Sequence, residues 1–323
     1  MDLPLINPFD FHSRFPHITE KVIEKLDDST LKNCRQVAKS WQNYIDDTNV
    51  PWIRIVNIPS IPQNGETYFQ IAAKAGQSKI TKMIIQDSKE LDLDLNDGWN
   101  DGNTAFQLAC LNGHLKVAEN IVQESANFNI NLNTGKFLDE GNEGHENTGF
   151  QLACKFGHLK LAEMLLEKSV HFDIDIHAMN ANGQTAFHLA CSDNYHSVNE
   201  SGKLLVAKLI IEKSAELDIN LNAKNYFGKQ TALHCACIGW YTDIVKLIIT
   251  KSIDFDINLN AKDENGRTAL HDVSKWGREC PNIVEIFIKN SVKFGIKLDA
   301  KDKEGLTTFH LACIGKSNVL LKI

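Results

Sequence analysis

The chain has 323 residues, of which 43% are hydrophobic and 23% are charged, and it contains no run of 18 apolar residues that would indicate a membrane span. Its 34 basic and 41 acidic residues give a net charge of -7, which argues against nucleic acid as the main partner because phosphate binding needs a concentrated basic surface. The first residues lack the basic start and apolar core of a secretory signal, so we expect a cytoplasmic or nuclear protein that is not bound to a membrane.

After a tail at residues 1–12, residues 13–58 do not repeat and predict three short helices. Apolar residues share one face of the first helix at helical spacing, from Ile18 to Leu26. The stretch Asp27-Asp28-Ser29-Thr30 breaks that helix and caps the next one. Because about 40 residues form only a small core, such a module should leave apolar side chains that need a partner.

This segment resembles an F-box, the small helical module that docks on the Skp-type adaptor of cullin-RING ubiquitin ligases. The resemblance implies that the adaptor-binding residues are Phe15, Pro16, Val22, Ile23, Leu26, Leu31, Val37 and Trp41, with Trp52 as the second tryptophan of the pattern. The chain departs from the family pattern in having Phe15 for Leu and Ala38 for Cys, and in having one residue fewer before Val22. The alternative is a three-helix cap that covers the first repeat.

From residue 61 to 323 the chain repeats. A Thr before an Ala-Leu or Ala-Phe type block marks each unit, and the markers are Thr67, Thr104, Thr148, Thr185, Thr231, Thr268 and Thr307. Their spacings are 37, 44, 37, 46, 37 and 39 residues, so the base period is 37. Each Thr is a good helix N-cap, and two short amphipathic helices follow it. Because one such hairpin cannot bury its apolar side alone, we expect the units to stack into a solenoid.

The repeat resembles the ankyrin family, whose unit opens with Thr-Pro-Leu-His-x-Ala. The match is clearest at Thr185 to Ala190 and Thr231 to Ala236, and Gly113-His114-Leu115 adds the turn between the helices. Pro never follows the Thr, Gln replaces His in the first three units, and the period exceeds the family's roughly 33 residues. The resemblance implies a mainly α fold of about seven units, the last incomplete, that binds proteins and is not an enzyme.

The extra residues lie between the helix pairs, in stretches such as Phe255 to Asn260, where apolar and polar side chains alternate. This alternation predicts a long β-hairpin finger with Phe255, Ile257 and Leu259 on one face. The family usually ends its second helix with Gly, whereas this chain has Ser at the corresponding place, at Ser88, Ser125, Ser169, Ser214, Ser252 and Ser291. We therefore expect these helices to end differently and to run on about a turn.

Recurring cysteines and histidines are interpreted as architecture. A Cys six residues after the marker occurs at Cys110, Cys154, Cys191, Cys237 and Cys313, which predicts close packing of a small residue rather than a metal site or disulfide. The His residues three after the marker predict structural hydrogen bonds. No cofactor or metal is expected, because no pair of Cys-x-x-Cys motifs and no catalytic or phosphate-binding motif is present.

Two inserts interrupt the period. Lys136 to Gly149 resembles a calcium loop only loosely, and we interpret it as a longer solvated finger. Ser192 to Lys203 adds eight residues between two helices and is interpreted as a surface loop, with a partner contact as the alternative. The chain stops where the last second helix should begin, near Val319, so we expect a fragment of a longer array; the alternative is that this end meets another protein.

Together the two parts predict a substrate receptor of a Skp/cullin-RING ubiquitin ligase, in which the first module binds the adaptor and the repeats bind a client protein. The alternative is a scaffold with no ubiquitin role, and a pathogen effector that uses a host ligase would look the same. Candidate client-binding residues lie where side chains vary from unit to unit, namely Trp99, Lys155, Phe156, Tyr226, Phe227, Ile238, Trp240, Tyr241, Lys275 and Trp276. The alternative for each is local packing between neighbouring loops.

Overall fold

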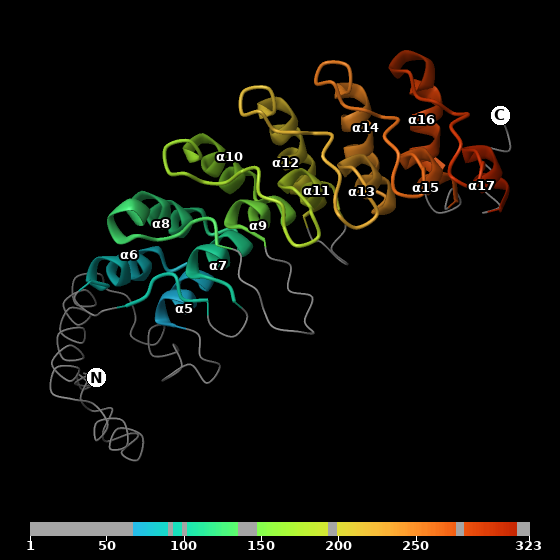
Figure 1. The fold of residues 1–323 in the computed structure, drawn as a ribbon. Helices are drawn as coiled ribbons and strands as arrows, with labels where there is room; N and C mark the ends of the chain where they lie inside the picture. Colours follow the sequence, from blue (N-terminus) through green and yellow to red (C-terminus); the bar gives the residue numbers. More distant parts are fainter. Residues whose placement is uncertain are drawn as a thin grey trace, which may run out of the picture.

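A computed structural model describes residues 67–89, 93–98, 102–134, 147–192, 199–275 and 281–314. The F-box-like segment, Trp99, Trp276 and the expected helix near Val319 lie outside these residues, as do most residues of the two inserts. The described part of the chain is a mainly helical solenoid in which each repeat contributes a pair of antiparallel helices (Figure 1).

The helix pairs follow one another along the chain with short turns inside each pair. They are α5 (Tyr68–Lys74) with α6 (Ser78–Asp87), α7 (Ala105–Leu111) with α8 (Leu115–Phe128), α9 (Gly149–Lys155) with α10 (Leu159–Lys168), α11 (Ala186–Cys191) with α12 (Glu200–Lys213), α13 (Ala232–Ile238) with α14 (Thr242–Lys251), and α15 (Ala269–Lys275) with α16 (Pro281–Phe294). A single first helix, α17 (Thr308–Ile314), ends the described part. In Figure 1 the first helices form one layer and the second helices another, and both layers curve together.

The marker threonines begin the first helices as predicted. In the first three units the Thr hydroxyl accepts the N–H of a Gln three residues later at 3.2 to 3.3 Å, and that Gln returns its side-chain oxygen to the Thr N–H at 2.7 to 3.0 Å. This capping box satisfies two backbone groups that a helix start would otherwise leave open.

One continuous hydrophobic core runs through the stack from Phe69 to Ala312. Neighbouring first helices pack closely because their facing residues are small, and Cys110, Cys154, Cys191 and Cys237 are at most 1% exposed. Burial raises the pKa of the Cys110 thiol, as expected for a thiol used for packing. The last member of the predicted row, Cys313, is exposed at the end of α17.

The second helices α8 and α16 run on past the Ser, as predicted, whereas the others end one residue before it and continue as turns. The Ser hydroxyl donates to the carbonyl three residues earlier, at 2.8 Å for Ser169 and Leu166. One further turn follows and closes at a residue with left-handed backbone, such as Asp173 with φ 50°. The next N–H, that of Ile174, donates back to the Ser169 carbonyl at 3.0 Å, which is the bond of a Schellman ending. Asn129, Asp218, Asp256 and Gly295 take the same left-handed place in other units.

The prediction that these segments form β-hairpins is wrong. Within the described residues the segments between helix pairs, which we call fingers, contain turns and one isolated bridge, between Lys301 and Thr307. The predicted inward face is correct, since Ile257 and Leu259 are buried and Phe255 packs on the core. The polar residues between them do not pair strands, because the Asn258 side chain accepts the Asn260 N–H at 3.0 Å and closes a local turn.

Candidate protein-binding surface

A row of side chains in the first helices holds successive units together. Gln70 Nε2 donates to the Asn103 carbonyl of the next unit at 2.8 Å, and His188 Nε2 donates to the Gln230 carbonyl at 3.0 Å. Gln and His thus make the same bond, which explains why Gln can stand in the first three units where His stands in the later ones. Burial lowers the pKa of His188, and the same cause lowers the pKa of His234 and His271. Their predicted structural role is consistent with these contacts.

A second row joins the turns between the helices of a pair. His114 Nε2 donates to the Lys74 carbonyl of the preceding unit at 2.9 Å, and His158 Nε2 donates to the Leu111 carbonyl at 3.0 Å. Each imidazole lies against a Gly with left-handed backbone, and a Cβ on Gly113 would come within 2.5 Å of the His158 ring. These turns have no space for a side chain at the Gly.

A third row crosses the fingers and was not predicted. Asn133 Nδ2 donates to the Asp173 carbonyl at 2.6 Å, while its Oδ1 accepts the Asp175 N–H at 2.8 Å. Asn96, Asn222 and Asn260 make the same pair of bonds to the next finger. The row is interrupted at His177, which occupies the corresponding place before α11. The signal in the sequence was the recurring Asn at the end of each alternating stretch.

A buried lysine replaces the turn histidine in the unit with the eight-residue insert. Lys203 is 0% exposed, its Nζ donates to the Ser192 carbonyl and lies 5.2 Å from the centroid of the Tyr241 ring. Asn199 Nδ2 meanwhile donates to the Phe156 and Gly157 carbonyls at 3.2 and 3.0 Å, the end of the preceding first helix. Asn199 therefore makes the bond to the preceding unit that a turn His makes elsewhere, while Lys203 binds within its own unit.

The predicted client-binding residues differ in what they expose. Tyr241 is 7% exposed, because it covers Lys203, and it presents little of its ring to a partner. Phe156 is half-buried, packs on the core and stacks on His158 with ring centroids 6.4 Å apart. The Lys155 ammonium lies 5.8 Å from the Phe156 centroid, and burial lowers the Lys155 pKa. Lys275 is exposed at the end of α15.

Four of the predicted residues form two exposed apolar groups at the two ends of α13. Tyr226 and Phe227, 59% and 84% exposed, are at the finger tip that precedes α13. Ile238 and Trp240, each 50% exposed, are at its other end. Trp240 has φ 59° and stands where other units have a left-handed Gly. A bulky residue in this conformation is an outlier that costs about 1–2 kcal/mol, so the fold alone does not favour it.

A carboxylate replaces an apolar residue in the first helix α15. Four residues after the marker, other units have residues such as Leu108, Leu152 and Leu189, whereas this unit has Asp272. The Asp272 Oδ2 atom is buried and has no hydrogen-bond partner within the described residues. Burial, with a smaller contribution from Asp263, raises the pKa of Asp272 to about 7.

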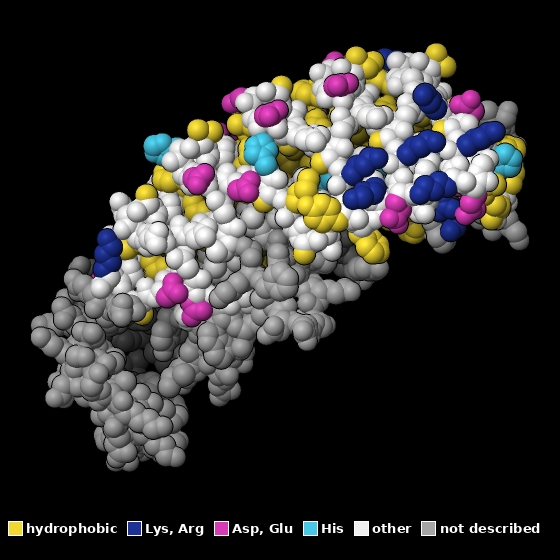
Figure 2. All heavy atoms as spheres, viewed as in Figure 1, with side chains coloured by type: hydrophobic (Ala, Val, Ile, Leu, Met, Phe, Trp, Pro, Cys, Tyr) yellow, Lys and Arg dark blue, Asp and Glu magenta, His cyan; other side chains and the backbone are white. Residues whose placement is uncertain are grey.

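Basic side chains gather on the C-terminal units, as Figure 2 shows. The last three fingers carry exposed lysines at Lys224, Lys229, Lys262, Lys297, Lys301 and Lys303. The described residues of the first three fingers, 93–98, 102–104, 129–134, 147–148 and 173–185, contain no Lys or Arg. The local charge therefore differs between the two ends of the array, which the net charge of the whole chain conceals.

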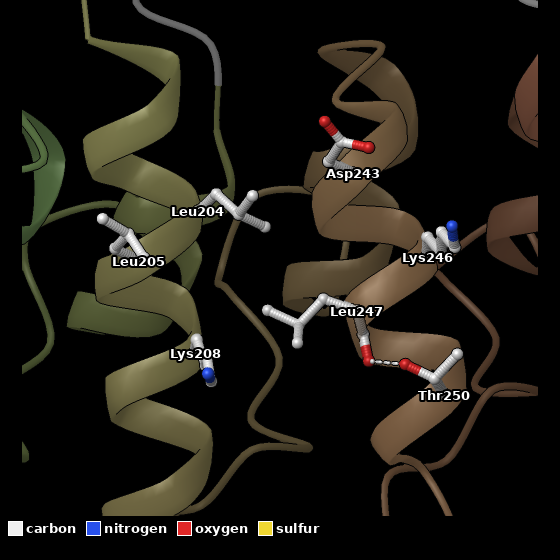
Figure 3. Close-up of a pocket in the computed structure, with 7 residues that line it drawn as sticks. All are labelled: Leu204, Leu205, Lys208, Asp243, Lys246, Leu247 and Thr250. Atoms are coloured by element: carbon white, nitrogen blue, oxygen red, sulfur yellow. Dashed lines mark hydrogen bonds between the residues drawn. The ribbon is translucent and has the colours of Figure 1, made fainter.

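A shallow apolar groove lies between the second helices α12 and α14. Leu204 and Leu247 point toward each other across it, and Lys208, Asp243 and Lys246 stand at its edges (Figure 3). Within the described part of the chain, no cluster of His, Cys, Asp and Glu could hold a metal ion, and no helix has the length and apolar character needed to cross a membrane.

Comparisons with known proteins agree with this architecture. A family model described as ankyrin repeats (3 copies) matches residues 45–134 and 195–302, and one described as ankyrin repeats (many copies) matches residues 150–199. No F-box model matches the chain, and the first ankyrin match begins inside the segment predicted to be F-box-like.

Two solved structures share the fold. The ankyrin repeat domain of Bcl-3, described as a unique member of the IkappaB protein family, has a TM-score of 0.60 and 20% sequence identity, covering 81% of this chain and 100% of that one. The human ASB11 ankyrin repeat domain has a TM-score of 0.58 and 18% identity, covering 80% of this chain and 97% of that one. No curated protein matches the sequence.

Proposed function

Because the chain belongs to the ankyrin-repeat family and is a protein-binding scaffold, we propose that it acts as a substrate receptor of a Skp/cullin-RING ubiquitin ligase. In this role, residues 13–58 bind the adaptor and the repeats bind the client. The client's lysines are thereby held near the ubiquitin-conjugating enzyme, and catalysis comes from proximity while the chemistry belongs to other subunits.

The exposed side chain of Trp240 is the observation that best supports client binding. The interior of the array repeats a small set of bonds, and a Gly in left-handed backbone recurs at the turns of the first three units. Trp240 departs from that pattern at a conformational cost and keeps half of its surface exposed beside Ile238. Exposed aromatic anchors provide much of the affinity in many protein interfaces. The exposed rings of Tyr226 and Phe227 provide a second anchor on the same unit.

The ligase part of the proposal is supported by the F-box-like residues from Phe15 to Trp41. Their apolar positions fit a helical module too small to bury all of them. The second candidate is a scaffold without a ubiquitin role, in which the same helices cap the first repeat. The start of the ankyrin match at residue 45 favours this second candidate.

A pull-down with purified Skp-type adaptor distinguishes the two candidates. The full chain should bind the adaptor, and the double variant Val22→Asp, Leu26→Asp should not. The matched control is Val170→Asp, Val292→Asp, which makes the same chemical change at side chains that are 88% and 95% exposed on the array. The control should bind like the parent, and all three proteins should share one helical content and melting temperature. If the unaltered chain fails to bind the adaptor, the ligase role is wrong and the scaffold remains.

A further inference from the structure

Three lysines form a row along the last three fingers. Lys224, Lys262 and Lys301 each stand six residues after the left-handed residue that ends the preceding helix pair. Lys224 Nζ donates to the Lys262 carbonyl at 2.6 Å, and Lys262 Nζ donates to the Lys301 carbonyl at 2.8 Å. Met179 has the corresponding place in the finger before them. We call Lys224, Lys262 and Lys301 the lysine row.

The lysine row presents its charge at a regular spacing. Neighbouring packed helices lie about 8–10 Å apart, so equivalent ammonium groups of successive units are about 10 Å apart. All three lysines are exposed, and each ammonium has three donors, of which a carbonyl uses one in Lys224 and one in Lys262. The bonds between fingers therefore orient the side chains and leave donors for a ligand.

Some of the acidic residues beside the lysine row already accept hydrogen bonds from backbone N–H groups. The Asp263 carboxylate accepts the N–H groups of Asn265 and Arg267 at 2.8 and 2.7 Å. Asp302 is buried, and its carboxylate accepts the N–H groups of Glu304 and Leu306. Glu264 and Glu304 remain exposed at the finger tips, opposite Lys229 and Lys303 in sign. The surface is thus positive at fixed points and is not uniformly basic.

An apolar anchor lies at one end of the lysine row. Tyr226 and Phe227 follow Lys224 at the tip of the same finger, and Lys229 Nζ lies 5.8 Å from the centroid of the Tyr226 ring. The tip is fixed to its neighbour, because the Tyr226 N–H donates to the Asn182 carbonyl at 2.8 Å. The rings are therefore displayed from an ordered backbone, which lowers the entropy cost of binding.

From this geometry we infer that the lysine row binds an extended acidic segment of a client protein, with an apolar residue against Tyr226 and Phe227. A segment in polyproline II conformation rises about 3.1 Å per residue with three residues per turn, so carboxylates at every third residue lie on one face about 9 Å apart and match the row. The inference rests on the proposed client-binding role of the array and specifies the chemistry of the client. It does not depend on the adaptor.

A peptide fits the surface better than a nucleic acid does. A nucleic-acid strand carries a phosphate at every nucleotide and would meet the exposed Glu264 and Glu304 as well as the lysines. Spaced carboxylates can avoid these two side chains, which then select against a continuous polyanion. The net charge of -7 adds a long-range repulsion that a short peptide experiences less than a long strand.

Fluorescence anisotropy with the full chain tests the inference. The probe is a short labelled peptide with Glu at every third position and Leu at each end. We expect binding that weakens as salt concentration rises, and at least tenfold weaker binding to the variant Lys262→Glu, Lys301→Glu. The control Lys160→Glu, Lys246→Glu makes the same charge change at exposed lysines of α10 and α14, and should bind like the parent. Equal melting temperatures show that the variants fold.

Two further probes test the spacing of the carboxylates and the chemical class of the ligand. A peptide of the same composition with its Glu residues contiguous should bind more weakly than the spaced peptide, and equal binding would overturn the match to the repeat. A single-stranded oligonucleotide that binds more tightly than the spaced peptide would overturn the choice of a protein segment. Absence of peptide binding at low salt up to about 1 mM would overturn the inference while adaptor binding still supports the proposed ligase role.

Discussion

The two halves of the array share their interior and differ in what they display. From α5 to α10 the units follow the repeat closely, with a left-handed Gly at the turns, Ile or Leu four residues after the marker Thr, and no Lys or Arg in the described residues of the fingers. From α13 to α17 the first and third rows of bonds persist, yet Trp240 replaces a turn Gly, Asp272 replaces a Leu and lysines occupy the fingers. Side chains that recur from unit to unit hold the units together. Residues that depart from the repeat are therefore the candidates for binding a partner.

The largest effect should come from filling a turn in the first half. A Cβ on Gly157 would meet the backbone N of Lys203 at 2.6 Å, and the backbone is left-handed with φ 69°. We expect Gly157→Ala to destabilise the array by about 4 kcal/mol, from strain plus overlap with a backbone that cannot rotate away. Thermal unfolding measures this.

Gly295→Ala is the matched control for that change. Gly295 has φ 63° and no atom within 4 Å of an added Cβ, so only the conformational cost of about 1 kcal/mol remains. If the two variants melt at the same temperature, contact between units at Gly157 contributes nothing beyond backbone strain.

The next effect concerns Asp272 in the second half. Its pKa of about 7 in the folded chain exceeds the ordinary value of 3.8, so the unfolded chain ionises first as pH rises. The folded state therefore loses stability between pH 4 and 7, at about 1.4 kcal/mol per pH unit. We expect Asp272→Asn to melt near the parent at pH 4 and to be about 4 kcal/mol more stable at pH 7. A difference independent of pH would show that Asp272 is ionised in the fold.

A smaller effect distinguishes Gln from His in the first row of bonds. Burial lowers the pKa of His188 and His234, so both remain neutral in the fold and their contribution is present above the ordinary His pKa of 6.5. As pH falls below 6.5 the unfolded chain binds protons first and this contribution is lost. The double variant His188→Gln, His234→Gln copies the first half and should lose less melting temperature between pH 7 and 5 than the parent. Equal losses would place the acid sensitivity elsewhere.

The smallest effect should be the relief of strain at Trp240. We expect Trp240→Gly to raise stability by about 0.5–1 kcal/mol, since the left-handed strain is removed while Gly adds entropy to the unfolded chain. Trp240→Asn, which tolerates this backbone, should also melt no lower than the parent. A lower melting temperature in both variants would mean that the indole is a packing residue and not a displayed one.

Much of the architecture could be predicted because it repeats. The Thr starts, the cysteine packing and the extra turn after Ser169 and its equivalents follow from residues that recur at a fixed place. The fingers were predicted as β-hairpins because alternation of apolar and polar residues is typical of strands. Here the same alternation places apolar side chains inward while Asn and Asp side chains close turns and bridge fingers. Periodicity alone cannot tell these two uses of a polar residue apart.

The candidate surface was only partly predictable. Exposed Tyr226, Phe227, Ile238 and Trp240 were found as departures from the repeat. Tyr241 was placed in the same set, because its partner Lys203 lies beyond an eight-residue insert that hides their shared place in the unit. The unpartnered carboxylate oxygen of Asp272 depends on neighbours in three dimensions, and no local pattern indicates it.

Thermal unfolding of two triple variants tests the central claim most directly. The first replaces displayed residues, Tyr226→Ser, Phe227→Ser and Ile238→Ser; the second replaces recurring ones, Gln107→Ala, Gln151→Ala and His188→Ala. Each recurring side chain satisfies buried backbone groups, at about 1–3 kcal/mol apiece, and a domain of this size loses about 2–4 °C per kcal/mol. We expect the first variant to melt within about 2 °C of the parent and the second to melt about 10 °C lower. If the first variant melted lower than the second, the recurring side chains would not be the ones that stabilise the array.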